Sequence, residues 1–130
     1  MNVSHPLVSV VDDDESVRES LPDLLKELGF SVKAFSSSEE YLASEHIGRT
    51  RCLILDVAMP GMTGPELHRE LARRGQSIPT IFITAHMGDA MRPSLIEQGA
   101  VDCLSKPFTE EALQKVLSLA LRLNRRPHLD

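Results

Sequence analysis

The sequence predicts an α/β fold in which five helices cover a doubly wound, five-stranded parallel sheet. Short apolar runs alternate with stretches whose apolar residues recur at three- and four-residue steps, as strands and helices respectively require. Several of the short runs are apolar at every position, which is typical of strands buried on both faces. With 130 residues, the chain fits one domain, which we expect to span residues 1–130 with a core over about residues 6–123.

The first half of the chain sets out this alternation. Residues 7–11 form a short β-rich run that stops at three aspartates, residues 12–14. A helical pattern over residues 17–28 follows, and the glycine behind it suits a helix end. Residues 30–35 then alternate apolar and polar side chains as a strand does. The serine hydroxyls and acids after them favour a helix over residues 38–44.

The second half repeats the alternation. The third strand ends at Asp56, and a turn-rich loop, residues 59–64, leads into the next helix. Pro93 lies where the fourth helix is expected. Because proline suits only the first turn of a helix, that helix should begin late and leave a long loop over residues 86–92. The expected strands cover residues 52–55, 80–84 and 101–104, and the expected helices cover residues 65–74, a stretch ending at Gly99, and residues 110–123.

Composition and charge exclude several classes of function. The formal net charge of −5 disfavours direct nucleic-acid binding, which needs clustered basic residues. No apolar run approaches the roughly 18 residues that span a bilayer, and the N-terminus lacks an export signal, so we expect a cytoplasmic protein without membrane contact. Cys52 and Cys103 lie in separate apolar runs and are expected to be buried, reduced thiols. The histidines show no zinc-site spacing.

Chemically useful side chains follow four of the expected strands. Asp12 and Asp13 come after the first strand, Asp56 ends the third, Thr84 ends the fourth and Lys106 follows the fifth. In a doubly wound sheet, ligands bind beyond these strand ends, at the reversal of winding. Neighbouring carboxylates repel each other unless a cation lies between them, and Mg²⁺ is commonly held by one or two carboxylates plus a phosphate. With a lysine and a hydroxyl available for phosphoryl oxygens, the set indicates phosphoryl transfer with Mg²⁺ as the cofactor.

Each of these residues also has a purely structural interpretation. For Asp14, the third acid of its run, we favour a helix cap over a metal ligand. Thr84 alone could cap a helix, and Lys106 alone could be a solvated loop residue. Taken together with Asp56, they favour a site. Two roles remain open for His86: it caps a helix at the surface, or it governs how water reaches the phosphoryl group.

Five stretches together resemble the receiver domain of bacterial response regulators, and the resemblance covers nearly the whole chain. They read Val-Asp-Asp, Leu-Asp, Met-Pro-Gly-Met-Thr-Gly, Ile-Thr-Ala and Ser-Lys-Pro-Phe, at residues 11–13, 55–56, 59–64, 83–85 and 105–108. Residues 82–86 and 99–102 further resemble the nitrogen-fixation branch of that family. Each stretch alone is weak evidence, and their shared order and positions carry the resemblance.

The resemblance implies a flavodoxin-like sheet with strands in the order 2-1-3-4-5. It implies that Asp56 accepts a phosphoryl group from a partner histidine kinase or phosphotransfer protein. Asp13, Asp56 and the backbone carbonyl of Ala58 would ligate Mg²⁺, with Asp12 reaching it mainly through water. The chain would be a signalling phosphoacceptor rather than an enzyme, either standing alone or forming the N-terminal part of a transcription factor. A homodimer formed on phosphorylation is a further expectation.

The same resemblance assigns the switch residues. Thr84 would be drawn toward the phosphoryl group, and Lys106 would pair with it. Members of the family usually carry an aromatic switch residue three positions before this lysine, and here that position is Cys103. A small thiol cannot swing between exposed and buried positions as a ring does. The loop between Thr84 and Pro93 should therefore carry more of the signal to the face formed by the fourth helix, fifth strand and fifth helix.

Two other functions share parts of this pattern. A haloacid-dehalogenase-type phosphatase also uses an aspartate nucleophile, Mg²⁺, a hydroxyl and a lysine, and residues 12–14 contain the spacing of its first motif. That family needs a further acidic pair on a strand after the lysine, whereas the acids beyond Lys106 lie on an expected helix or in the tail. A phosphate- or flavin-binding module of the same fold is disfavoured, because no glycine-rich loop follows the first strand.

Overall fold

The computed structural model describes residues 5–124. Five parallel strands form one sheet in the order β2-β1-β3-β4-β5, so the predicted fold class and strand order are confirmed. The strands are β1 (Leu7–Val11), β2 (Ser31–Phe35), β3 (Thr50–Asp56), β4 (Thr80–Thr84) and β5 (Asp102–Ser105). The helices are α1 (Glu15–Glu27), α2 (Ser38–Leu42), α3 (Gly64–Arg73), α4 (Met91–Glu97) and α5 (Glu110–Asn124), with a short 3-10 helix η1 (Ile47–Arg49).

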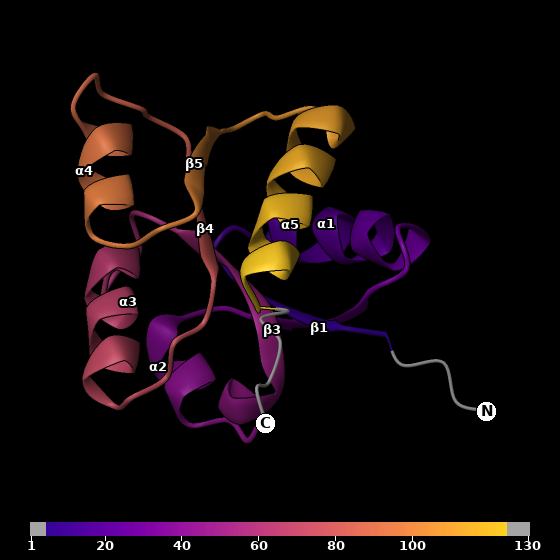
Figure 1. Ribbon diagram of the computed structural model, residues 1–130, viewed down its shortest axis with the longest axis horizontal. Helices are drawn as coiled ribbons and strands as arrows, with labels where there is room; N and C mark the ends of the chain where they lie inside the picture. Colours follow the sequence, from indigo (N-terminus) through magenta and orange to yellow (C-terminus); the bar gives the residue numbers. More distant parts are fainter. Residues whose placement is uncertain (1–4, 125–130) are drawn as a thin grey trace.

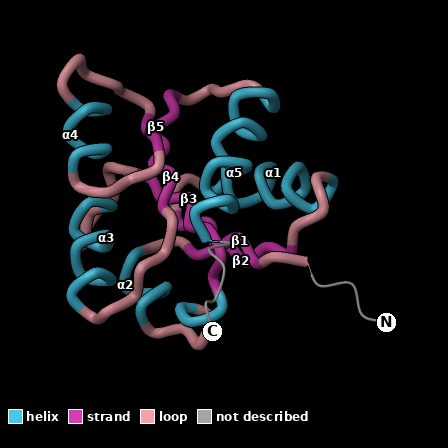
Figure 2. The backbone as a smooth tube through the Cα atoms, in the orientation of Figure 1, coloured by secondary structure: helices cyan, strands magenta, loops and turns pink. Residues whose placement is uncertain are grey.

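The elements form three layers. Figure 1 shows α1 and α5 on one side of the sheet and α2, α3 and α4 on the other. In Figure 2 the strands form a band between these two groups of helices. β1 pairs with β2 along one edge and with β3 along the other, so the winding reverses at this point of the sheet. The ends of β1 and β3 are therefore where such a sheet offers a binding site.

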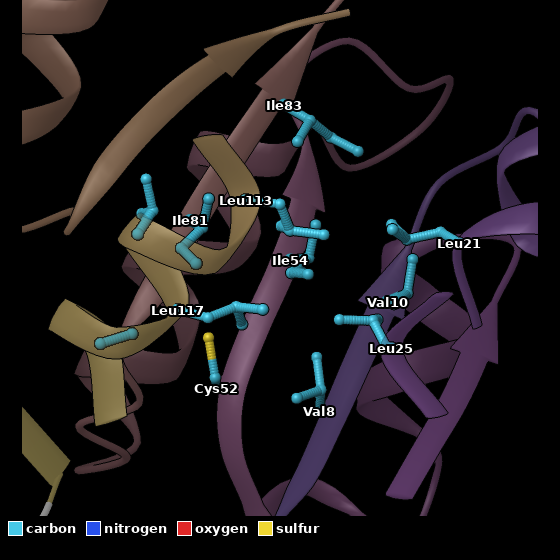
Figure 3. Packing of buried hydrophobic residues seen from close by; sticks show 12 residues of the cluster. Val8, Val10, Leu21, Leu25, Cys52, Ile54, Ile81, Ile83, Leu113 and Leu117 are labelled. Atoms are coloured by element: carbon cyan, nitrogen blue, oxygen red, sulfur yellow. The ribbon is translucent and has the colours of Figure 1, made fainter. Parts of the chain in front are cut away.

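Both faces of the sheet are covered, which explains strands that are apolar throughout. On the side that we call the α1/α5 face, Val10 and Ile54 belong to one buried cluster with Leu25 of α1 and Leu117 of α5 (Figure 3). On the opposite side, which we call the α2–α4 face, Phe82 belongs to a second cluster with side chains from α2, α3 and α4. The hydrophobic effect thus fixes both helical layers against the sheet.

Local sequence explains where two of the helices begin. The carboxylate of Asp14 accepts the backbone N–H of Ser16 (3.0 Å) and caps α1, which confirms the structural interpretation of that acid. α4 begins late, at Met91, as the position of Pro93 led us to expect. Its preceding residue, Ala90, has no side-chain cap to offer. One helix next to the site is thus firmly capped and the other is not.

Some boundaries differ from the prediction. β3 begins at Thr50, two residues early, because the Thr50 hydroxyl can enter the core while hydrogen-bonded to Ser9, Tyr41 and the carbonyl of His46. α2 is two residues shorter than expected, β2 begins one residue later, and α3 and β5 shift by one residue. η1 was not predicted, since it is a single turn closed by a bond from the Arg49 N–H to the His46 carbonyl.

Both cysteines are free and buried, as predicted. Cys52 lies in the cluster of the α1/α5 face (Figure 3), and Cys103 lies in the cluster of the α2–α4 face. Among residues 5–124, no helix is both long and apolar enough to cross a lipid bilayer.

Candidate functional site

Two aspartates lie at equivalent positions where β1 and β3 end. Val11 pairs with Leu55 across the two strands, and Asp12 and Asp56 are the next residues of each chain segment. The Asp12 N–H also donates to the carbonyl of Phe35 at the end of β2 (3.1 Å), which extends the sheet pairing beyond β1. The fold thus brings together acids that are 44 positions apart in the sequence.

A third acid completes the cluster. Asp12, Asp13 and Asp56 each place one carboxylate oxygen within 4.8 Å of the other two. Asp12 is fully buried, Asp56 is 5% exposed, and Asp13 is exposed, so the cluster reaches solvent on the Asp13 side. A hard divalent ion such as Mg²⁺ takes carboxylate oxygens at this kind of spacing and retains several waters. The three residues therefore fit the cation that the sequence predicted.

Lys106 supplies the positive charge of the site. It follows β5, and its Nζ lies 2.8 Å from Oδ2 of Asp12 and 3.7 Å from Oδ1 of Asp56. Burial disfavours the ammonium ion, but the hydrogen bond to Asp12 and the charges of both aspartates outweigh this effect, so the pKa of Lys106 lies above its usual value. The lysine is therefore a fixed cation beside the acids.

One lysine does not neutralise three carboxylates. Burial, followed by the negative charge of Asp12, raises the pKa of Asp56 to about 7, although Lys106 acts in the opposite direction. Near neutral pH the Asp56 carboxyl group is therefore part protonated when no other cation is near. A cation placed among the acids would favour the ionised form, which is the form that can act as a nucleophile.

Thr84 closes the site on the β4 side. Its carbonyl accepts the N–H of Lys106 (2.8 Å), which ties the end of β4 to the lysine. The residue is only 3% exposed, and its hydroxyl oxygen lies 3.2 Å from both the backbone nitrogen and the carbonyl oxygen of His86. The His86 side chain is exposed. The Thr84 hydroxyl is thus engaged with the loop that leads to α4.

The loop after Asp56, residues 57–63, folds back onto the end of β3. The Val57 N–H donates to the Ile83 carbonyl (3.0 Å), and the Gly64 N–H donates to the Val57 carbonyl (3.1 Å). A Cβ atom at Gly64 would lie 2.1 Å from the carbonyl oxygen of Asp56, so glycine is required at this close approach. Ala58, the remaining predicted ligand, is an exposed residue of this loop.

Cys103, the predicted switch position, lies outside the acid cluster. It is 2% exposed on β5, within the core of the α2–α4 face. Burial raises the pKa of its thiol to about 11. The Cys103 side chain is thus already packed in the interior. An aromatic switch residue, by contrast, would have to move from an exposed to a buried position.

Sequence reasoning missed two contacts at the site. Arg18 of α1 donates from Nη1 to the backbone carbonyl of Asp12 (3.0 Å). Glu39, interpreted only as an early acid of α2, accepts the N–H of Met62 in the loop after Asp56 (2.9 Å). An arginine one turn beyond a capping aspartate is a local signal that could have revealed the first contact. The second joins segments 23 positions apart, and no local pattern indicates it.

Comparisons with known proteins point to one family. A family model described as the response regulator receiver domain matches residues 8–118. The response regulator protein TmoT of Ectopseudomonas mendocina is 42% identical over 123 residues, which cover 95% of this chain and 56% of that protein. The transcriptional regulatory protein FixJ of Rhizobium meliloti is 39% identical over 113 residues, which cover 87% of this chain and 55% of that protein.

Solved structures of response regulators have the same fold. The response regulator StyR superposes with a TM-score of 0.85 at 42% identity, covering 93% of this chain and 61% of the other. A structure of FixJ-N superposes with a TM-score of 0.81 at 35% identity, covering 98% of each chain. The chain spans just over half the length of TmoT and FixJ. These matches give no support to the haloacid-dehalogenase alternative.

Proposed function

The chain belongs to the response regulator receiver domain family, and from that premise we propose that Asp56 accepts a phosphoryl group from a partner histidine kinase or phosphotransfer protein. The observation that carries the proposal is the position of Asp56 at the end of β3, 3.7 Å from the Lys106 ammonium and within the three-acid cluster. Asp14 caps α1, and Asp12 already binds Lys106 at 2.8 Å. Asp56 is therefore the favoured nucleophile.

The proposed reaction forms an acyl phosphate. A carboxylate oxygen of Asp56 attacks the phosphorus of a phosphohistidine, an O–P bond forms, and the N–P bond breaks. The imidazole nitrogen leaves with the bonding electron pair. Lys106 and the Thr84 hydroxyl would then contact phosphoryl oxygens, and positive charge held in place before the reaction lowers the barrier. The domain would thus assist its own phosphorylation. Attack of water on the same phosphorus would break the O–P bond to Asp56, release inorganic phosphate and restore the Asp56 carboxylate.

Asp13, Asp56 and the Ala58 carbonyl are proposed to hold Mg²⁺, with Asp12 contributing mainly through water. When bound, Mg²⁺ would neutralise charge on the phosphoryl oxygens during transfer. Two observations support this assignment. The carboxylate oxygens lie within 4.8 Å of one another, and burial together with the charge of Asp12 raises the pKa of Asp56, so a bound cation would stabilise its ionised form. The exposure of Asp13 leaves a path from solvent.

The output is proposed to pass through Thr84. Its hydroxyl cannot turn to the phosphoryl group and keep both present contacts with His86, so phosphorylation would rearrange the loop that leads to α4 into a different, more ordered conformation. The changed face around α4 and β5 could then support a homodimer. By analogy with FixJ, a transcriptional regulatory protein, we propose a cytoplasmic role in transcriptional control, with the described domain as its receiver part.

The acceptor assignment is tested by phosphorylation in vitro. With Mg²⁺ and acetyl phosphate, intact-mass spectrometry should show one added phosphoryl group on the natural protein and none on Asp56→Asn. Asp14→Asn is the matched control: it removes a neighbouring acid but keeps a capping side chain, so it should label normally. Full labelling of Asp56→Asn would place the acceptor elsewhere.

The metal assignment is tested by thermal unfolding. Mg²⁺ at several times its Kd should stabilise the natural protein by about 1 kcal/mol, and Asp13→Ala should lose most of this increment because one ligand is gone. The increment, rather than the melting temperature itself, is the quantity to compare, since removing an acid also relieves repulsion. Asp14→Asn should retain it. An undiminished increment in Asp13→Ala would show that the metal binds at another place.

A further inference from the structure

Hydrogen bonds hold the loop after Asp56 near its tip as well as at its ends. Its ends are closed by the bonds from Val57 to Ile83 and from Gly64 to Val57. Between them, Met59 is buried in the α2–α4 face, whereas the tip at Pro60 and Gly61 is exposed. An exposed tip would be free to move unless a neighbouring element held it.

Glu39, in the first turn of α2, is that neighbour. Its Oε2 accepts the Met62 N–H at 2.9 Å. A Cβ atom at Gly61 would lie 2.7 Å from the same oxygen, and Gly61 has a φ of +75°, which favours glycine in its own right. The carboxylate therefore lies directly over the tip, in space that residue 61 leaves open because it has no side chain.

We infer that Glu39 is a positioning residue for phosphoryl transfer at Asp56. By fixing the tip, Glu39 restricts the path of residues 57–60, which lead directly from the acceptor and include Ala58. A shift of about an ångström in a group that lines a reacting centre costs up to about a hundredfold in rate. The inference rests on the proposed function of Asp56, and it adds a residue of α2 that touches neither the acids nor Lys106 in the contacts described above.

The competing explanation is that Glu39 merely stabilises the start of α2, as acids in a first helical turn do. Glu40 provides the comparison. It is the next residue of the same turn and carries the same charge, but its carboxylate accepts the N–H and hydroxyl of Ser36 (2.6 and 3.0 Å). Glu40 thus supports α2 locally and makes no described contact with the loop.

The experiment compares Glu39→Ala, Glu39→Gln and Glu40→Ala with the natural protein. Two quantities are measured: amide–water exchange at Met62 by NMR without phosphodonor, and the rate of labelling by acetyl phosphate with Mg²⁺. Losing a charge-assisted hydrogen bond in Glu39→Ala should speed Met62 exchange about three- to tenfold. It should slow labelling about two- to fivefold. Glu39→Gln keeps an acceptor oxygen and should restore most of both quantities, and Glu40→Ala should change neither beyond the error of measurement.

Three outcomes would overturn the inference. Equal slowing of labelling in Glu39→Ala and Glu40→Ala would assign the effect to the stability of α2. Equal slowing in Glu39→Gln and Glu39→Ala would assign it to charge. Faster Met62 exchange with normal labelling in Glu39→Ala would show a contact that does not position the acceptor. If the natural protein itself fails to label, the proposed function fails instead, which separates the two conclusions.

Discussion

The two faces of the sheet differ in the length of their helices and in the type of side chain that they bury. The α1/α5 face has two long helices, of 13 and 15 residues, and its buried residues are aliphatic apart from Cys52, with Phe30 and Phe108 packed partly buried against them. The α2–α4 face has shorter helices, of 5, 10 and 7 residues. Its buried cluster includes three aromatic rings, a thiol and a thioether, namely those of Phe35, Tyr41, Phe82, Cys103 and Met59. Three further thioethers, those of Met62, Met87 and Met91, pack partly buried against it.

The contrast is sharpest at α4. Leu95 is its one buried residue, Met91 is half-buried, and no side chain caps the helix at Ala90. An ion pair ties the helix to β5, with Arg92 Nε 2.6 Å from Oδ1 of Asp102, but the Arg92 side chain is 55% exposed, and such pairs contribute little to stability. Thioethers and thiols adapt to altered packing more readily than branched side chains do. One face is therefore suited to remain fixed while the other changes.

The largest expected effect tests this contrast through core truncation. Leu117→Ala on the α1/α5 face should lower the free energy of unfolding by about 2–5 kcal/mol, because it leaves a cavity among rigid aliphatic neighbours. Met91→Ala on the α2–α4 face should cost about 1 kcal/mol, since that side chain is only half-buried and its surroundings can relax. Urea denaturation of both variants provides the measurement. Equal losses would remove the distinction between the faces.

The next effect concerns the acids at the edge where the two faces meet. The pKa of Asp56 is raised in the folded protein, to about 7 from 3.8, so the folded state holds this proton more tightly than the unfolded state. Stability from this group is therefore greatest below about pH 4 and falls as pH rises toward 7. Asp56→Asn should flatten that slope and, at pH 7.5 without Mg²⁺, should be more stable by up to about 4 kcal/mol.

Urea unfolding at several pH values checks this prediction. Asp14→Asn is the control, because the hydrogen bonds from Ser16 hold the pKa of that exposed acid below its usual value, and its removal should not flatten the slope between pH 4 and 7. A slope unchanged in Asp56→Asn would show that another group carries the pH dependence.

The smallest expected effect is the one closest to signalling. Phosphorylation should draw the Thr84 hydroxyl away from His86 and order the segment that follows, so amides of residues 86–95 should gain protection from hydrogen exchange. A gain of about fivefold, or roughly 1 kcal/mol, is expected for a segment of low local stability. Amides of α1 serve as the internal reference. High and unchanged protection over residues 86–95, together with a response in α1, would move the signal to the other face.

The sequence predicted the sheet because β1, β3 and β4 are short, mostly apolar runs that end at or just before a polar residue, Asp12, Asp56 and Thr84 respectively. It predicted the acid cluster because parallel strands bring their carboxyl ends to one edge. It could not predict that the Thr84 hydroxyl would contact His86, or that Glu39 would reach Met62. Such contacts depend on side-chain rotamers and loop paths, which three-dimensional packing decides.

The two buried cysteines can report whether the α2–α4 face opens more readily than the α1/α5 face. Burial raises the pKa of Cys52 to about 12 and that of Cys103 to about 11, so the reactive thiolate is scarce at both positions while the protein stays closed. The rate of alkylation then depends on how often each thiol becomes exposed by local opening. Cys52 reports opening of the α1/α5 face, and Cys103 reports opening beside α4. Mass spectrometry of digested samples taken over time from one reaction with the unmodified protein would give an alkylation rate for each cysteine. The rate at Cys103 should be the higher of the two.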